Sequence, residues 1–151
     1  MPELRDYRPA DFKQLWELDQ RCFSPAIAYS REELAHYLQN RTAICVVAWE
    51  DARALGFIVG HVVRGGIGHI VTLDVDPAAR RTGLGSTLMR SVEERFRLAR
   101  CSSIMLEVAV NNKAALAFYK NHEYSVLKVL RRYYPDGLDG FLMGKQLLQP
   151  E

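Results

Sequence analysis

The chain has 151 residues, enough for one domain spanning residues 1–151 and too few for a second of typical size. Because 48% of the residues are apolar, a chain of this length can bury a core without disulfide or metal staples. Lysine and arginine total 20 against 18 aspartates and glutamates. This balance argues against a nucleic-acid-binding protein, in which basic residues dominate.

The cysteines are three, widely spaced, and include no CxxC pair, so neither a disulfide framework nor a zinc site is indicated. No metal-ligand spacing links the histidines, and we expect no bound metal. We assign no role to His36, His61, His69 and His122. The polar first residues lack a signal-peptide core, and every apolar run is shorter than the roughly 20 residues that cross a bilayer. We therefore expect a cytoplasmic protein without membrane or nucleic-acid partners.

Periodicity and turn residues predict a mixed order of strands and helices. In chain order we expect a strand at residues 4–7, helices beginning after Asp11 and Ser30, strands at 43–49, 54–63 and 67–75, a helix from about residue 83, a strand at 104–110, a helix at 112–121, and strands at 124–134 and 140–147. Ser30 with Glu33 three residues later is typical of a capping box. A meander followed by a βαβ unit favours an α/β (α+β) fold with helices on the sheet faces.

An arginine-rich turn follows the strand that ends before Pro77, and Gly83 and Gly85 stand where the next helix begins. Glycines let a ligand approach the backbone closely, and the first N–H groups of a helix suit a pyrophosphate. The dinucleotide pattern GxGxxG fails because Leu88 occupies its third glycine position, and no GK[ST] is present. From these residues alone, a tight turn with solvated arginines and an anion-binding turn both stay open.

The run Arg80-Arg81-Thr82-Gly83-Leu84-Gly85 resembles the RxxGxG/A signature with which GNAT acetyltransferases hold the pyrophosphate of acetyl-CoA. The resemblance implies the GNAT fold, with a mixed, mostly antiparallel sheet of about seven strands and about four flanking helices. It also implies acetyl-CoA as the acetyl donor. The cofactor-binding residues that it implies are Leu73, Asp74, Val75, Arg80, Arg81, Thr82, Gly83, Leu84, Gly85, Ser86, Asn112 and Tyr119.

Glu107 lies in the last strand before the final helix and shares a face with Met105 and Ala109 by strand alternation. A carboxylate on an otherwise apolar face favours function over packing, although a structural ion pair is the alternative. Asn112 is well placed to cap the next helix. Tyr119 lies about two turns later and points the same way, as a functional hydroxyl or as a core aromatic residue.

This segment resembles the LEV…N…A…Y block of the bacterial ribosomal-protein alanine N-acetyltransferases (RimI), including the interval of twelve residues (119 − 107) from Glu to Tyr. The resemblance implies that Glu107 is the general base, acting through water, and that Tyr119 protonates the departing CoA thiolate. Asn112 would contact the cofactor. Direct attack in a ternary complex would draw its rate mainly from proximity.

Two further segments are expected to bind the acceptor. Tyr133 and Tyr134 resemble the paired tyrosines of amino-terminal acetyltransferases, which bind the substrate backbone from the loop between the last two strands. By analogy, Phe23, Ile27 and Tyr29 would shape the pocket for the first side chain. The chain departs from the family pattern at His122-Glu123-Tyr124, at Asp139-Gly140 and at Asp74.

The leading interpretation is acetylation of the N-terminal α-amino group of a protein, such as a ribosomal protein that begins with alanine. One alternative is acetylation of a small amine, an antibiotic or a lysine side chain. Another is a non-catalytic acetyl-CoA-binding sensor module. Glu107 together with Tyr119 argues against the sensor, and the tyrosine pair favours a peptide over a small amine.

Overall fold

The computed structural model describes residues 2–147, and its centre is one mixed sheet with strand order β1-β2-β3-β4-β5-β7-β6. Neighbouring strands are antiparallel except for the parallel pair β4 and β5. This confirms the expected mixed, mostly antiparallel sheet. The strands are β1 (Glu3–Asp6), β2 (Ile44–Glu50), β3 (Arg53–Val63), β4 (Ile67–Val75), β5 (Ser103–Ala109), β6 (Ser125–Leu130) and β7 (Gly140–Gln146).

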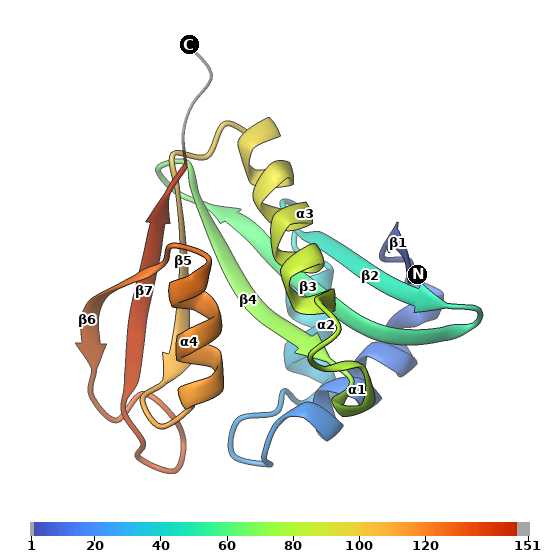
Figure 1. Cartoon of the computed structure of the whole chain (residues 1–151), viewed down its shortest axis with the longest axis horizontal. Helices are drawn as coiled ribbons and strands as arrows, with labels where there is room; N and C mark the ends of the chain where they lie inside the picture. The colour runs from blue at the N-terminus through green and yellow to red at the C-terminus, as the bar shows by residue number, and fades with distance from the viewer. Residues whose placement is uncertain (1, 148–151) are drawn as a thin grey trace.

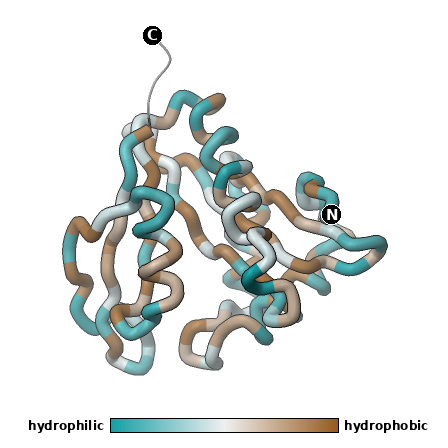
Figure 2. Tube along the Cα trace, viewed as in Figure 1, coloured by the Kyte–Doolittle hydropathy of each residue, from teal (hydrophilic) through white to brown (hydrophobic). Residues whose placement is uncertain are grey.

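Helices cover both faces of the sheet (Figure 1). They are α1 (Phe12–Cys22), α2 (Arg31–Leu38), α3 (Leu84–Leu98) and α4 (Lys113–Asn121), with short 3-10 turns at Pro9–Asp11 and Pro77–Ala79. Alternation in β2 divides the core, because Val46 packs on the α3 side and Val47 packs with α1 and α2. Figure 2 shows apolar residues along the strands and polar ones on the turns. No helix within residues 2–147 has the length and apolar character needed to span a membrane.

Side-chain caps define two of the helix starts. Ser30 and Glu33 form the expected capping box at α2, with bonds of 3.1 and 2.9 Å. Asn112 Oδ1 accepts from the N–H of Ala115 at 3.1 Å and caps α4, as expected. Helix α1 begins after Asp11, as expected, but the Asp11 side chain does not cap it. Its carboxylate instead accepts from the N–H of Arg8 at 2.9 Å.

The expected strand at 124–134 is too long, because β6 ends at Leu130. Arg132 has a φ of 51°, a left-handed conformation that ends the extended backbone. The Arg132 N–H donates to Asp139 Oδ1 at 2.9 Å, and the Tyr134 N–H donates to the carbonyl of Leu138 at 3.1 Å. Tyr133 and Tyr134 therefore lie in the loop between β6 and β7.

The sheet opens between its two parallel strands (Figure 1). Pairing of β4 with β5 covers only Ile67–His69 and ends where His69 lies opposite Met105. Just beyond, the register of β3 with β4 passes from Gly60–Ile70 to Val59–Thr72, which leaves Val71 as an extra, bulged residue. The bulge bends β4 where it parts from β5, and this opening creates the site.

Candidate active site

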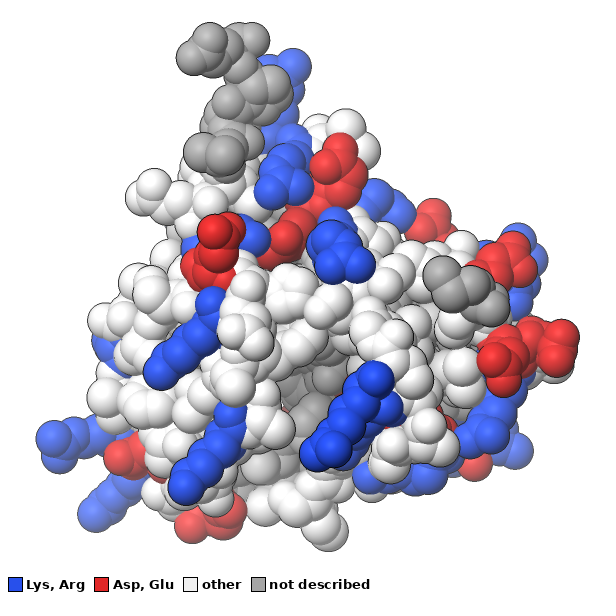
Figure 3. Space-filling view, viewed as in Figure 1, with Lys and Arg blue, Asp and Glu red and all other residues white. Residues whose placement is uncertain are grey.

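A cleft of about 1290 Å³ occupies the opening between β4 and β5. Figure 3 shows a hollow on this face with basic side chains at its rim. The expected site residues that line the cleft are Phe23, Ile27, Tyr29, Leu73, Val75, Arg80, Arg81, Gly83, Gly85, Ser86, Glu107, Asn112, Tyr119, Tyr133 and Tyr134. Segments from both ends of the chain therefore meet at one cavity.

Three of the expected residues do not contribute to the cleft lining. Thr82 donates its hydroxyl to the carbonyl of Ala79 at 2.6 Å and so stabilises the turn. Leu84 is buried in the core beneath α3. Asp74 is fully buried and bonded to Thr72, so its departure from the family pattern concerns the support of β4.

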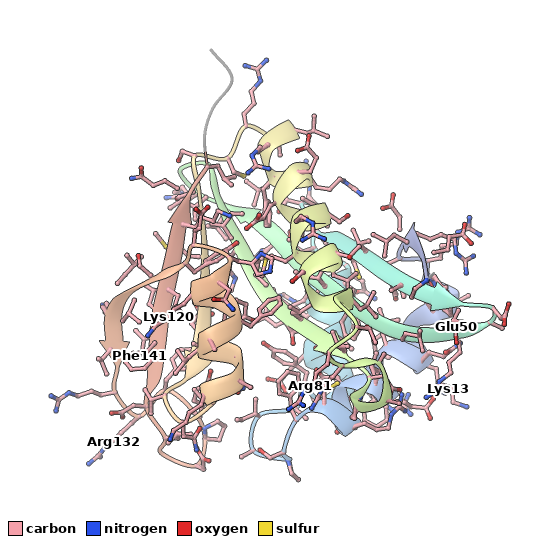
Figure 4. All side chains as sticks on the ribbon, in the orientation of Figure 1. Lys13, Glu50, Arg81, Lys120, Arg132 and Phe141 are labelled. Atoms are coloured by element: carbon pink, nitrogen blue, oxygen red, sulfur yellow. The ribbon has the colours of Figure 1, made fainter. Side chains whose placement is uncertain are left out.

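The turn before α3 offers backbone donors to an anion. Gly83 is the N-cap residue with a φ of 85°, and no side chain caps the helix. A Cβ atom added at Gly83 would meet no protein atom within 4 Å, so the space beside it is open. Arg81 also has a left-handed φ of 64°, and Figure 4 shows it near the N-terminal end of α3. Open N–H groups at a helix start, beside arginines, fit a pyrophosphate.

Glu107 makes its hydrogen bond with a histidine to which the sequence assigned no role. Its Oε1 lies 2.8 Å from His69 Nε2, and His69 Nδ1 lies 3.1 Å from His61 Nε2. The side chains of Glu107 and His69 are 21% and 22% exposed, which leaves the carboxylate accessible from the cleft. Glu107 can therefore accept a proton from a ligand in the cleft.

Tyr119 comes from α4 and packs its ring against Phe118 and Tyr124. Burial raises the pKa of the Tyr119 hydroxyl above its ordinary value of 10, and the negative charge of Asp74 acts in the same direction. The hydroxyl therefore remains protonated throughout the neutral range. A protonated phenol in the cleft can donate to a leaving thiolate.

The loop from Phe23 to Tyr29 is held in place by its last residue. The Tyr29 carbonyl accepts from Trp16 Nε1 at 3.1 Å and from Gln20 Nε2 at 2.8 Å. Its hydroxyl donates to the carbonyl of Val71 at 3.3 Å, which ties the loop to the bulge in β4. This wall of the cleft is thus fixed against both α1 and the sheet.

The opposite loop brings two tyrosines to the cleft. The rings of Tyr133 and Tyr134 meet edge to face, with centroids 5.0 Å apart. Burial raises the pKa of Tyr133 to about 12, and the charge of Glu107 is the next cause. The pKa of Tyr134 is also raised to about 12, by burial and then by Tyr133. Both hydroxyls are donors at neutral pH.

Helix α2 adds Glu33 and Tyr37 to the lining, and the sequence analysis did not anticipate them. The two positions are four residues apart, so they share one face of the helix. This spacing was a readable signal, but it does not say which face meets a ligand.

Comparison with known proteins identifies the family to which this chain belongs. The sequence model of the Acetyltransferase (GNAT) family matches residues 12–124. The chain belongs to the GNAT acetyltransferase family. It is 41% identical to an uncharacterized N-acetyltransferase of Methanocaldococcus jannaschii over 95% of this chain and 90% of that protein. An N-alpha-acetyltransferase of Sulfurisphaera tokodaii is 28% identical over 95% of this chain and 92% of its own length.

The fold is also that of a solved N-acetyltransferase structure. The ribosomal-protein-S18-alanine N-acetyltransferase from Escherichia coli superimposes with a TM-score of 0.88 at 23% identity, over 100% of this chain and 97% of that one. Membership in the GNAT family makes the chain an acetyltransferase that uses acetyl-CoA as donor. The open turn before α3 is chemically suited to the pyrophosphate of that donor.

A buried pair of carboxyls supports the GNAT cleft from behind. Asp19 on α1 and Asp74 on β4 are both fully buried. Among the described residues, the buried side-chain oxygens without a hydrogen-bond partner are Asp19 Oδ1 and Asp74 Oδ2. The two carboxyls can bond to each other only when one of them is protonated. Burial, and next the contact with Asp19, raises the pKa of Asp74 well above its ordinary 3.8. One shared proton therefore joins α1 to β4, while Asp19 Oδ2 accepts from the N–H of Tyr29 at 2.8 Å.

Asp74→Asn is expected to remove a pH dependence of stability. The pKa of Asp74 is higher in the folded protein than in the unfolded chain. Its contribution to folding stability is therefore complete below about pH 3.8 and is lost as pH rises through the folded pKa. The loss is about 1.4 kcal/mol per pH unit within that window. An asparagine amide donates to Asp19 at any pH. The stability of the variant relative to the wild type should therefore increase as pH rises. Urea unfolding of both proteins at several pH values measures this, and a constant difference would contradict the shared proton.

Proposed function

We propose that this acetyltransferase acetylates the N-terminal α-amino group of a protein, ribosomal proteins included. One observation carries the proposal: Glu107 and Tyr119 share a single cleft with the phosphate-binding turn and with the two loops that hold Tyr29 and the tyrosine pair. A chain end can enter between two loops and bring its amine to a base and an acid. The similarity to the N-alpha-acetyltransferase of Sulfurisphaera tokodaii supports the same class of acceptor.

The proposed reaction uses this chain's residues in three tasks. The turn at Arg80–Ser86 and the start of α3 hold the pyrophosphate of acetyl-CoA, with Asn112 nearby. Glu107 accepts a proton from the substrate ammonium, through water, because only the neutral amine attacks the thioester carbonyl. The nitrogen–carbon bond forms, the carbon–sulfur bond breaks, and Tyr119 donates its proton to the CoA thiolate. The nitrogen then loses its second proton, which restores Tyr119, and Glu107 releases the first proton to solvent.

An α-amine suits this base better than a lysine does. An α-amino group has a pKa of roughly 8, whereas a lysine side chain has a pKa of roughly 10.4. A carboxylate that is partly open to the cleft removes a proton from the α-ammonium group far more readily than from a lysine near neutral pH. A peptide acceptor also uses Tyr133 and Tyr134, whose hydroxyls can donate to the carbonyls of the first substrate residues.

Removing both hydroxyls, in Tyr133→Phe with Tyr134→Phe, is expected to raise the peptide KM by about tenfold or more. Each lost hydrogen bond is worth about 0.5–1.5 kcal/mol, while the rings still pack as before. The acetyl-CoA Kd should not change. Steady-state kinetics with a short peptide measures the effect, and Tyr7→Phe is the matched control because Tyr7 packs with α1 and α2 outside the cleft lining. A normal peptide KM in the double variant would show that the pair does not bind the substrate backbone.

The position of the transferred acetyl group tests the proposal itself. A peptide with a free α-amine and an internal lysine is incubated with enzyme and acetyl-CoA, and fragmentation by mass spectrometry locates the added acetyl group. We expect modification at the α-amine. Modification at the lysine would contradict the proposal and favour the side-chain alternative.

A further inference from the structure

Two histidines connect Glu107 to the interior strands of the sheet, and the acetyl-transfer reaction described above uses neither of them. His61 Nε2 and His69 Nδ1 are 3.1 Å apart, and His69 Nε2 is 2.8 Å from Glu107 Oε1. The rings of the two histidines lie edge to face with centroids 5.2 Å apart. The three side chains thus form a continuous chain of hydrogen bonds.

The register of the sheet builds this chain. His61 on β3 lies directly opposite His69 on β4, and His69 lies opposite Met105 on β5. Glu107 is two residues beyond Met105, and so it is the next side chain on the same face. Since β4 and β5 pair no further than His69 and Met105, the row ends where the cleft opens. Glu107 is therefore positioned by three strands of the sheet.

The hydrogen-bond types fix the direction of the chain. An ionised carboxylate only accepts, so His69 Nε2 must carry a hydrogen and donate it to Glu107. A neutral His69 then presents Nδ1 as an acceptor, and His61 Nε2 donates to it. Burial lowers the pKa of His61, followed by repulsion from His69 and His36, and this favours the neutral His61 that the chain requires. Every N–H in the chain points toward Glu107.

The other groups around the row are tyrosines and one further histidine. Helix α2 contributes His36, which is exposed, and Tyr37, whose ring centroid is 6.0 Å from that of His61. The loop residue Tyr29 and the pair Tyr133 and Tyr134 face Glu107 closely enough for its charge to raise their pKa values. These phenols are neutral near pH 7. His69 Nε2 lies in direct contact with the carboxylate, 2.8 Å from Oε1.

We propose that His69 is a positioning residue for the general base Glu107, and that His61 holds His69 in the tautomer that donates to it. The proposal rests on the proposed role of Glu107. The hydrogen bond holds Oε1 and so fixes the orientation of a carboxylate that lines the cleft.

Variants at His69 separate positioning from packing. His69→Leu removes the donor, and we expect kcat to fall about 10- to 100-fold with the acetyl-CoA Kd unchanged. His69→Gln keeps an N–H donor, so it should recover most of kcat. His61→Leu should cause a smaller fall in kcat, of about three- to tenfold.

Three results would overturn the proposal. An unchanged kcat in His69→Leu would do so, as would a change in peptide KM alone, which indicates packing. A His69→Gln variant as impaired as His69→Leu would show that His69 itself must carry the proton. Thermal unfolding of each variant checks that it is folded. If His69→Leu does not fold, the comparison of kcat between His69→Gln and the wild type tests the proposal in its place.

Comparison with Glu107→Gln keeps this inference distinct from the proposed function. If Glu107→Gln is inactive while His69→Leu is normal, the positioning role fails and the base assignment stands. If Glu107→Gln is fully active, the base assignment fails first. Should both singles be impaired, the double variant Glu107→Gln with His69→Leu is expected to be no slower than Glu107→Gln alone, because His69 acts through Glu107. Independent, multiplicative losses would contradict the proposal.

Discussion

Glu107→Gln is expected to lower kcat for acetyl transfer to a peptide amine by about 10²- to 10⁴-fold, the range associated with loss of a general base. Glutamine has nearly the same size, and its side-chain oxygen can still accept from His69 Nε2. It cannot take a proton from an ammonium group near neutral pH. The peptide KM and the acetyl-CoA Kd should therefore change little, which is the pattern of a lost transition-state interaction.

The pH dependence and a surface control sharpen this prediction. Above about pH 8 a growing share of the α-amine is already neutral, so the deficit of Glu107→Gln should become smaller as pH rises. Glu94→Gln is the matched control, because Glu94 is exposed on α3 and lies 3.6 Å from Arg97. If Glu107→Gln keeps a kcat close to that of Glu94→Gln across the pH range, Glu107 is not the base.

Gly83→Val is expected to weaken acetyl-CoA binding by at least about tenfold. The φ of 85° at Gly83 is a left-handed conformation that a β-branched residue strongly disfavours, at a cost of about 1–3 kcal/mol. The open space beside Gly83, in which a Cβ meets nothing within 4 Å, is also where we propose that the pyrophosphate binds. Both effects act on the turn that presents the first N–H groups of α3. Isothermal titration with acetyl-CoA measures the change in Kd.

Gly65→Val separates backbone strain from ligand binding. Gly65 has a φ of 88° and an equally open surrounding, but it lies in the turn between β3 and β4, outside the cleft lining. Both variants should lose stability to a similar extent, while only Gly83→Val should lose affinity for acetyl-CoA. Equal affinities in the two variants would contradict the assignment of the phosphate-binding turn.

Local signals in the sequence predicted much of the framework. The capping residues Ser30 and Asn112 act through bonds to neighbours three residues away, so their roles are readable from sequence alone. Strand alternation likewise places Glu107 on one face of β5 together with Met105. Mixed topology follows from the element order, because a βαβ unit after a meander requires one parallel pair.

The hydrogen-bonded row through His61 and His69 could not be predicted in this way. Glu107 is 38 residues from His69, and the two meet only because the last pair between β4 and β5 is His69 with Met105. A shift of that register by one residue would turn one of the two side chains to the other face. Spacing in a single sequence does not define strand register, so the histidines showed no pattern.

Long-range packing and backbone conformation account for the remaining differences. The run before Tyr133 reads as a strand, and what ends it is a positive φ at Arg132, a non-glycine residue with no conformational signature. Asp74 interrupts an apolar strand, and its partner, Asp19, is 55 residues earlier (74 − 19) on a helix of the other layer. In each case the deciding contact is absent from the local sequence.

The most direct test of the central claim is thiol release from acetyl-CoA with matched peptides. One peptide has a free α-amine and no lysine, and the other has a blocked amino terminus and an internal lysine. Acetylation of protein amino termini predicts turnover with the first peptide and little with the second. Turnover that requires the lysine and ignores the free α-amine would contradict it, as would saturable binding of acetyl-CoA without turnover of either peptide.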